Sequence, residues 1–300
     1  NHYKYFGIHF TLGTIALIIL TFFFGTKILG AERWLTIGPL SIQPSELGKL
    51  AAVFLAADTM AHSKHIFDRK MVVNFFLIGV MIILILKQPS LSVAMITTFT
   101  TICVMFLGGF PSRILVPIMI AGIASVSYLI SKTPYQMARI EGWLNPWKDP
   151  TALGYNIIQS WYAFGSGGVL GVGFGQSKQK LSYLPFSHTD FIFAIIGEEF
   201  GLIGCILVIG LFAGFTYRGF FVSFMCEDKY GRLLAIGITS AIAIQAFINM
   251  AVATAVMPPT GITLPLTSSG GSSTLTIFLM LGILLNISRK RIQRLHTNVH

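Results

Sequence analysis

Residues 191–217 read FIFAIIGEEFGLIGCILVIGLFAGFTY, an apolar run whose only charged residues are Glu198 and Glu199. A helix of this length extends about 40 Å at 1.5 Å per residue, which exceeds the roughly 30 Å of hydrocarbon in a bilayer. The run therefore predicts a membrane-spanning helix. The chain on either side of it repeats the same apolar pattern.

The composition supports this interpretation. The chain has 300 residues, of which 54% are hydrophobic and only 11% charged, and its mean hydropathy is +0.74. A soluble domain carries about 25% charged residues. A soluble Rossmann enzyme, a disordered tail and a disulfide-stapled secreted domain are thereby excluded. Cys103, Cys205 and Cys226 lie within or beside apolar runs and are expected to be inert packing residues.

Eight apolar stretches approach the length of a span. They fall at 6–29, 45–61, 72–87, 91–108, 114–131, 191–217, 233–256 and 273–287. The predicted fold class is all-α: a polytopic transmembrane helix bundle that forms a single domain over 1–300.

The net charge of +10 indicates membrane topology and not nucleic-acid binding, because basic residues gather on the cytoplasmic side of membrane proteins. An even number of spans places both termini on one side. The basic tail at 289–294 marks that side as cytoplasmic. The alternate loops agree, since they carry Arg69, Arg113, Arg218 and Arg232 on that same side.

The segment 132–190 contains no spanning run and is predicted to be a large extracytoplasmic loop. Loops of this length are commonly functional. It contains an amphipathic piece at 155–164 and a glycine cluster at 165–175. The cluster lacks the lysine of a nucleotide-binding loop, so a turn-rich loop that touches lipid or substrate is the better interpretation.

Charged residues near the outer ends of spans are the candidates for chemistry. Glu46 and Lys49 share one helix face, and they either line a functional cavity or form a structural ion pair. Asp190 stands where the chain enters the membrane from outside. It is either a general base with a raised pKa or a helix cap. Glu198 and Glu199 need partners inside the span, on a proton or substrate path or in a structural tie.

The loop at 257–273 is broken by prolines and opens a helix with hydroxyl side chains. Free N–H groups at a helix start attract anions, so this loop could hold a phosphate-bearing ligand; ordinary capping of the last span is the alternative. The same side carries Arg33, Lys49, Arg139, Lys178 and Lys180. The sequence has no HExxH motif, no His/Cys metal-ligand spacing and no GxSxG motif.

Four motifs together resemble the SEDS family of cell-wall polymerases in order and spacing. They are Gly-Ala-Glu-Arg-Trp at 30–34, Gln-Pro-Ser-Glu-x-x-Lys at 43–49, Leu-Pro-x-x-His-Thr-Asp-Phe-Ile-Phe at 184–193, and Pro-Pro-Thr-Gly-Ile-x-Leu-Pro-Leu-x-Ser-x-Gly-Gly-Ser-Ser at 258–273. The last loop is closer to the division member than to the elongation member, and the sporulation paralogue stays open. Ser269 departs from the tyrosine of that motif. Family members have ten spans, and the aligned motifs imply that this chain begins at the third.

The resemblance implies a peptidoglycan glycosyltransferase that polymerises lipid II at the outer face of the bacterial cytoplasmic membrane, at the division septum. Asp190 matches the essential acid and is expected to act as the base. The expected substrate-binding residues are Arg33, Glu46, Lys49, Arg139, Lys180, His188 and Ser272, with Arg33, Arg139 and Lys180 as a pyrophosphate clamp. The implied partners are a class B penicillin-binding protein and other division membrane proteins, with no nucleic acid. No cofactor is certain; a divalent cation, Mg²⁺ or Mn²⁺, stays open.

Two alternatives belong to other functional classes. A lipid II flippase would account for the intramembrane Glu198 and Glu199, and a non-catalytic division scaffold would need no chemistry at Asp190. Substitution of Asp190 distinguishes a polymerase from a scaffold, and the leaflet in which labelled lipid II resides distinguishes it from a flippase.

Overall fold

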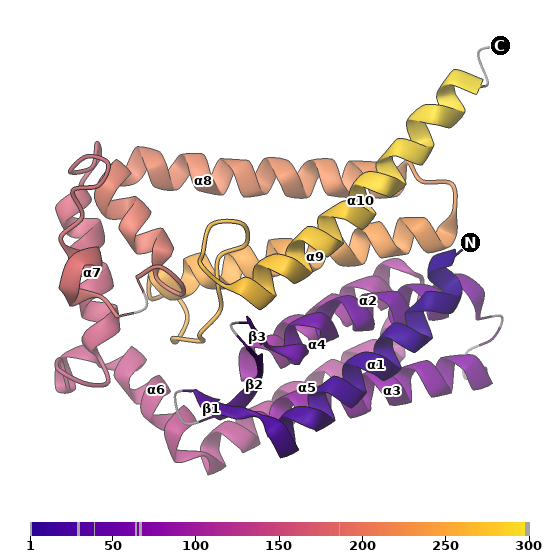
Figure 1. Cartoon of the computed structure of the whole chain (residues 1–300), viewed down its shortest axis with the longest axis horizontal. Coiled ribbons are helices and arrows are strands. Elements are labelled where there is room, and N and C mark those ends of the chain that lie inside the picture. Colours follow the sequence, from indigo (N-terminus) through magenta and orange to yellow (C-terminus); the bar gives the residue numbers. More distant parts are fainter. Residues whose placement is uncertain are drawn as a thin grey trace. The chain divides into compact units, whose positions relative to one another are not determined.

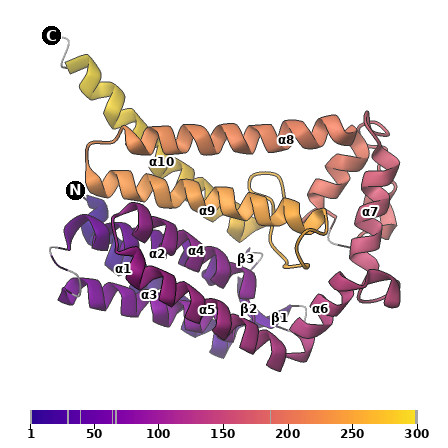
Figure 2. The same cartoon turned by 180° about the vertical axis from the view of Figure 1, so that it is seen from behind.

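The computed structural model describes residues 2–28, 31–38, 40–63, 65, 68–185 and 187–297 (Figures 1 and 2). Helices account for most of these residues. The helices are α1 (His2–Phe24), α2 (Pro44–His62), α3 (Arg69–Lys87), α4 (Leu91–Leu107), α5 (Ser112–Lys132), α6 (Pro134–Leu144), α7 (Tyr155–Gly167), α8 (Ile192–Phe224), α9 (Lys229–Ala253) and α10 (Gly271–Thr297). The strands are β1 (Thr26–Ile28), β2 (Ala31–Ile37) and β3 (Leu40–Ile42).

Each of the eight predicted spans is a helix, which confirms the expectation of a helical, multi-span chain. Among the described residues, six helices are long and apolar enough to cross a membrane: α1, α3, α5, α8, α9 and α10. Two of the predicted spans are not among these six helices. One of them, α4, is a shorter apolar helix. The other, α2, carries Glu46, Lys49 and Asp58. Its side chains are buried from Pro44 to Met60 with few exceptions, so a more polar composition is tolerated there.

The prediction was wrong about the end of the first span. That span was expected to reach residue 29, but α1 ends at Phe24 and the chain then forms a three-stranded antiparallel sheet in the order β1-β2-β3. Thr26 pairs with Trp34, and Leu35 pairs with Ile42. β-Branched and aromatic residues favour strands. Gly38, with φ of +60°, provides the backbone conformation that the turn between β2 and β3 requires.

The chain forms two compact units. The first consists of residues 1–111, 215–244 and 270–300, and the second of residues 112–214 and 245–269. Helices α8 and α9 each contribute residues to both units.

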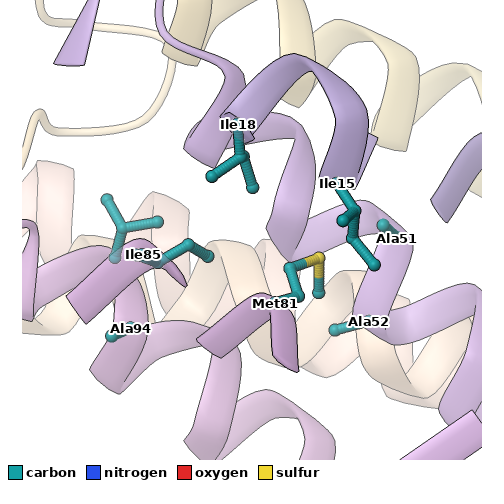
Figure 3. Packing of buried hydrophobic residues seen from close by; sticks show 8 residues of the cluster. Ile15, Ile18, Ala51, Ala52, Met81, Ile85 and Ala94 are labelled. Atoms are coloured by element: carbon teal, nitrogen blue, oxygen red, sulfur yellow. The ribbon is translucent and has the colours of Figure 1, made fainter. Parts of the chain in front are cut away.

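The first unit is built around α2. Side chains of α1, α2, α3 and α4 meet in its core, where Ile15, Ile18, Ala51, Ala52, Met81, Ile85, Val93 and Ala94 are buried (Figure 3). Small residues let the helices approach closely. A Cβ added at Gly237 of α9 would lie 2.5 Å from Val53 Cγ1 of α2, so only glycine allows this contact.

In the second unit, the segment 132–190 is more structured than a loop. The amphipathic piece predicted at 155–164 is confirmed as α7, which buries Ile157, Ile158, Ser160 and Ala163. Helix α6 and two short helical turns, at Pro146–Lys148 and Gln179–Tyr183, were not predicted. Helix α7 lies beside the first part of α8 (Figures 1 and 2).

Helix α8 is broken at Gly201, where φ is 63° and ψ is −161°. The glycine cluster fills this break. The N–H groups of Val172 and Gly173 donate to the carbonyls of Glu198 and Glu199, at 2.9 and 3.0 Å. The N–H of Leu202 in turn donates to the carbonyl of Gly168 at 2.9 Å. A helix broken at membrane depth must find partners for its freed backbone groups, and the turn-rich cluster supplies them.

Candidate functional site

Asp190 lies in the short loop that leads into α8, and the backbone of this loop is fastened to residues 249–269. The carbonyl of His188 accepts hydrogen bonds from the N–H and Oγ of Ser269, at 2.9 and 3.0 Å. The carbonyl of Thr189 accepts from Ser268 Oγ at 2.5 Å. The carbonyl of Asp190 accepts from Asn249 Nδ2 at 2.9 Å. Three consecutive carbonyls are thus satisfied by one neighbouring segment.

The Asp190 carboxyl is partly buried, which changes its acidity. Burial raises the pKa of Asp190 from its ordinary value of 3.8 to about 6, although the positive charge of Arg139 and a hydrogen bond from the Thr189 side chain lower it. A carboxyl group with this pKa is ionised at neutral pH and accepts a proton more readily than an ordinary aspartate. The prediction of a raised pKa is confirmed. Because α8 begins two residues later, at Ile192, Asp190 does not occupy the position just before the helix that a cap requires.

Arg139 belongs to the same site. Its guanidinium lies over the ring of Tyr135, with 4.7 Å from Cζ to the ring centroid, and its Nη1 donates to the carbonyl of Pro259 at 3.2 Å. One turn further along α6, Trp143 Nε1 donates to the carbonyl of Ala255 at 2.8 Å. Helix α6 is therefore fastened to the proline-containing loop and brings a positive charge into the electrostatic environment of Asp190.

The same loop also approaches the carboxylate. Gly261 has φ of +74°, and a Cβ added to it would lie 3.7 Å from Asp190 Oδ2. Gly261 of the Pro-Pro-Thr-Gly motif therefore lies next to the carboxylate of Asp190.

Glu198 and Glu199 have partners within their own unit. The carboxylate of Glu198 accepts hydrogen bonds from Ser177 Oγ and from the N–H groups of Lys178 and Gln179, the latter two at 3.1 and 3.3 Å. Lys180 Nζ lies 2.5 Å from Glu199 Oε1. Of the two interpretations of these acids, the geometry favours the structural tie. Lys180, predicted to bind pyrophosphate, is engaged in an ion pair.

The His188 side chain is exposed, and its backbone carbonyl accepts the two hydrogen bonds from Ser269. The remaining predicted residues lie in the first unit. Glu46 and Lys49, on the first turns of α2, form an ion pair with 2.8 Å between Oε2 and Nζ. Lys49 is 2% exposed and Glu46 8% exposed. Such a pair is costly to break on one side only.

Arg33 and Ser272 fasten backbone segments in the first unit. Arg33, on β2, donates from Nη2 to the carbonyl of Pro89 at 2.7 Å. Ser272 Oγ accepts from the N–H of Gln43 at 2.8 Å and lies 3.3 Å from the carbonyl of Ser41, to which it donates. Ser272 therefore joins the start of α10 to the residues just before α2.

The structure thus divides the predicted residues. It brings Asp190, Arg139 and the backbone of His188 together in the second unit, where Lys180 pairs with Glu199. It places Arg33, Glu46, Lys49 and Ser272 in the first unit.

Sequence reasoning missed two groups. One is Asn249, a fully buried amide in α9 that contacts the backbone of Asp190; a polar residue inside an apolar span was the available signal. The other surrounds Asp58, whose carboxylate lies 2.7 Å from Lys70 Nζ and 3.0 Å from His62 Nδ1.

Among the residues that the structure describes, no three His, Cys, Asp or Glu side chains gather closely enough to hold an ion.

Comparison with known proteins identifies the family. Residues 1–293 match the FtsW/RodA/SpoVE family, described as cell cycle proteins. A probable peptidoglycan glycosyltransferase FtsW from Geobacter metallireducens is 37% identical over 295 residues, which cover 97% of this chain and 79% of that protein. Stage V sporulation protein E of Bacillus subtilis is 42% identical over 263 residues, covering 87% and 72%.

Solved structures agree. A chain from a peptidoglycan synthase complex that coordinates polymerization and crosslinking matches with a TM-score of 0.81 and 30% identity, covering 97% of this chain and 83% of that one. The rod shape determining protein RodA of Thermus thermophilus matches with a TM-score of 0.70 and 27% identity, covering 96% and 79%. This multi-pass membrane protein belongs to the SEDS family, the FtsW, RodA and SpoVE cell cycle proteins.

Proposed function

We propose that this chain is a peptidoglycan glycosyltransferase that polymerises lipid II during cell division, with Asp190 as its base. The observation that carries the proposal is the carboxyl of Asp190, which lies next to Gly261 of the Pro-Pro-Thr-Gly loop, is made more basic by burial and is close enough to Arg139 to be affected by its charge. Relatives named as probable peptidoglycan glycosyltransferases, which this chain matches over nearly its whole length, support it.

The reaction balances with these residues. Asp190 takes the proton from the C4 hydroxyl of a GlcNAc as that oxygen attacks the anomeric carbon of the MurNAc on a second lipid-linked chain. The bond from the anomeric carbon to the pyrophosphate oxygen breaks, and undecaprenyl pyrophosphate leaves with the electron pair. Attack from the face opposite the leaving group inverts the anomeric configuration.

The leaving group carries negative charge, which cations stabilise in the transition state. In this proposal Arg139 and Lys180 of the second unit contact the pyrophosphate, and the same role for Arg33 stays a prediction from the sequence. Lys180 must leave its ion pair with Glu199 to do so. Glu46, Lys49, His188 and Ser272 are the proposed contacts to the remainder of the substrate.

Orientation and partners complete the proposal. The positions of the basic residues favour cytoplasmic termini and an active site on the outer face of the membrane. The match to a family of cell cycle proteins supports a location at the septum. The match to a chain of a peptidoglycan synthase complex supports a crosslinking partner, a class B penicillin-binding protein, together with other division membrane proteins. The transport alternative is weakened, because Glu198 and Glu199, which partly motivated it, are engaged by Ser177 and Lys180.

The pH dependence of polymerisation tests the role of Asp190. A base must be deprotonated, so kcat/KM is expected to rise with pH through about 6, the pKa of this carboxyl, and to level off above it. Because the Arg139 charge lowers this pKa, Arg139→Gln should move the rise to higher pH. Initial rates between about pH 4.5 and 8 measure both. Lys148→Gln, which neutralises an exposed cation of the same unit, is the control. If kcat/KM rises over the same pH range in Arg139→Gln as in the wild type, the assignment of Asp190 as the base is contradicted.

The buried ion pair allows a second test. Glu46→Gln removes the charge opposite Lys49 and is expected to destabilise the protein by about 3 kcal/mol, because an ammonium is left buried without its counter-charge. Glu46→Gln/Lys49→Met removes both charges and should recover most of the melting temperature. If the pair also contacts substrate, this stable double variant polymerises at least tenfold more slowly than wild type. Wild-type activity of the double variant would leave the pair a purely structural role.

A further inference from the structure

Asn249 makes an unusual connection in the second unit. It lies four residues before the end of α9 and is fully buried. Its Nδ2 donates to the carbonyl of Asp190 at 2.9 Å and to the carbonyl of Ile262 at 2.6 Å. An amide nitrogen carries two hydrogens, so one side chain can satisfy both carbonyls.

The two carbonyls belong to the two segments that must meet around the acid. One is the carbonyl of Asp190 itself. The other belongs to the residue after Gly261, the glycine whose added Cβ would lie 3.7 Å from Asp190 Oδ2. Asn249 of α9 therefore binds both the backbone of Asp190 and the backbone next to Gly261, which lies beside the carboxylate. These two hydrogen bonds fix the distance between the two segments.

We propose that Asn249 is a positioning residue for Asp190: its amide holds the acid and the Pro-Pro-Thr-Gly loop together in the geometry that proton abstraction requires. The inference rests on the proposed glycosyltransferase function and assigns the geometry of its base to a residue of α9. A displacement of about 1 Å in a reacting group can cost 10²-fold in rate. Both hydrogens of the buried Asn249 amide are used in these two bonds, whereas its Oδ1 has no hydrogen-bond partner among the described residues.

Helix α9 supplies a matched control. Gln245, one turn before Asn249, donates from Nε2 to the carbonyl of Thr263 in the same loop at 3.0 Å. Replacing Gln245 by methionine removes an amide of the same chemistry, on the same helix, that bonds the covering loop one residue further on. Asn249→Leu removes the hydrogen bonds to the carbonyls of Asp190 and Ile262, whereas Gln245→Met removes the hydrogen bond to the carbonyl of Thr263.

The test uses Asn249→Leu, which removes the donors while keeping a similar volume, and Asn249→Gln, which keeps the amide but moves it one methylene away from the helix. Each variant is purified with its crosslinking partner, checked for folding by thermal melting, and assayed with lipid II. We expect both to lower kcat by roughly 10- to 100-fold while KM changes less than about threefold.

The pH profile gives a readout that a lower folded fraction would not change. Burial is the largest cause of the raised pKa of Asp190, with Arg139 of α6 and the adjacent Thr189 acting against it. Loosening the cover in Asn249→Leu hydrates the carboxyl, so the rise in kcat/KM should move from about pH 6 toward 3.8. In Gln245→Met the rise should stay near pH 6.

The outcomes separate the two proposals. A wild-type chain that makes no glycan strand overturns the proposed function. An active wild type whose folded Asn249→Leu keeps both kcat and the pH profile overturns the positioning role alone. If Asn249→Leu does not fold, a wild-type kcat in Asn249→Gln overturns it equally.

Discussion

Asp190→Asn is expected to reduce the rate of lipid II polymerisation by about 10²–10⁴-fold, the contribution that a positioned general base commonly makes. The amide has nearly the same shape as the carboxyl but cannot accept the proton of the attacking hydroxyl. The backbone contacts of Asp190 are made by its carbonyl and not by its side chain, so the fold should survive. The measurement is the initial rate of lipid II consumption, with the melting temperature determined in parallel.

Glu141→Gln is the control for this substitution. Glu141 is an exposed carboxylate on α6, two residues after Arg139, and its replacement makes the same change in net charge. It should retain wild-type activity. An Asp190→Asn protein that polymerises at the wild-type rate would instead leave the scaffold interpretation standing.

Gly201→Ala has the second large expected effect, on stability. Its backbone, with φ of 63° and ψ of −161°, is a conformation that essentially only glycine adopts. A Cβ there would also lie 2.4 Å from the carbonyl oxygen of Val169. Gly171→Ala, on the opposite side of the same contact, would place a Cβ 2.2 Å from the carbonyl oxygen of Glu199. Because of these clashes, either substitution must push the glycine cluster at 165–175 away from α8 at Gly201.

We expect each of these glycine substitutions to cost about 3–5 kcal/mol, the range of severe single substitutions. Thermal melting of the purified chain in detergent measures the loss. Gly165→Ala is the matched control, because a Cβ at Gly165, near the end of α7, meets no atom within 4 Å. Equal melting temperatures for Gly201→Ala and Gly165→Ala would contradict the structural role of the break.

The helices could be predicted from the sequence because a long apolar run is typical of a segment within the lipid bilayer, where the backbone must form a helix to satisfy its hydrogen bonds. The run at 191–217 became part of α8, and the amphipathic piece at 155–164 became α7. The strands β1 and β3 have three residues each, too few for a period-two pattern to emerge. The break at Gly201 was equally hidden, since a glycine inside an apolar run is compatible with an intact helix.

The candidate site was predictable in its residue types but not in its pairings. The raised pKa of Asp190 followed from its place at a membrane boundary. That Lys180 pairs with Glu199, 19 residues away, depends on how the glycine cluster folds onto α8. Ser269, which departs from the tyrosine of the family motif, still fastens the carbonyl of His188 through its N–H, a contact that any side chain except proline permits. Asn249 acts on Asp190 across 59 residues, a contact that only the tertiary structure shows.

The central claim is that this chain forms glycosidic bonds and does not move its substrate across the membrane. The most direct measurement reconstitutes the purified chain and its crosslinking partner in vesicles with labelled lipid II. It reads the glycan products on a gel and, in the same sample, the leaflet in which the remaining lipid II resides. We expect a ladder of glycan strands that disappears in Asp190→Asn. Labelled lipid II that changes leaflet without forming any ladder would contradict the central claim.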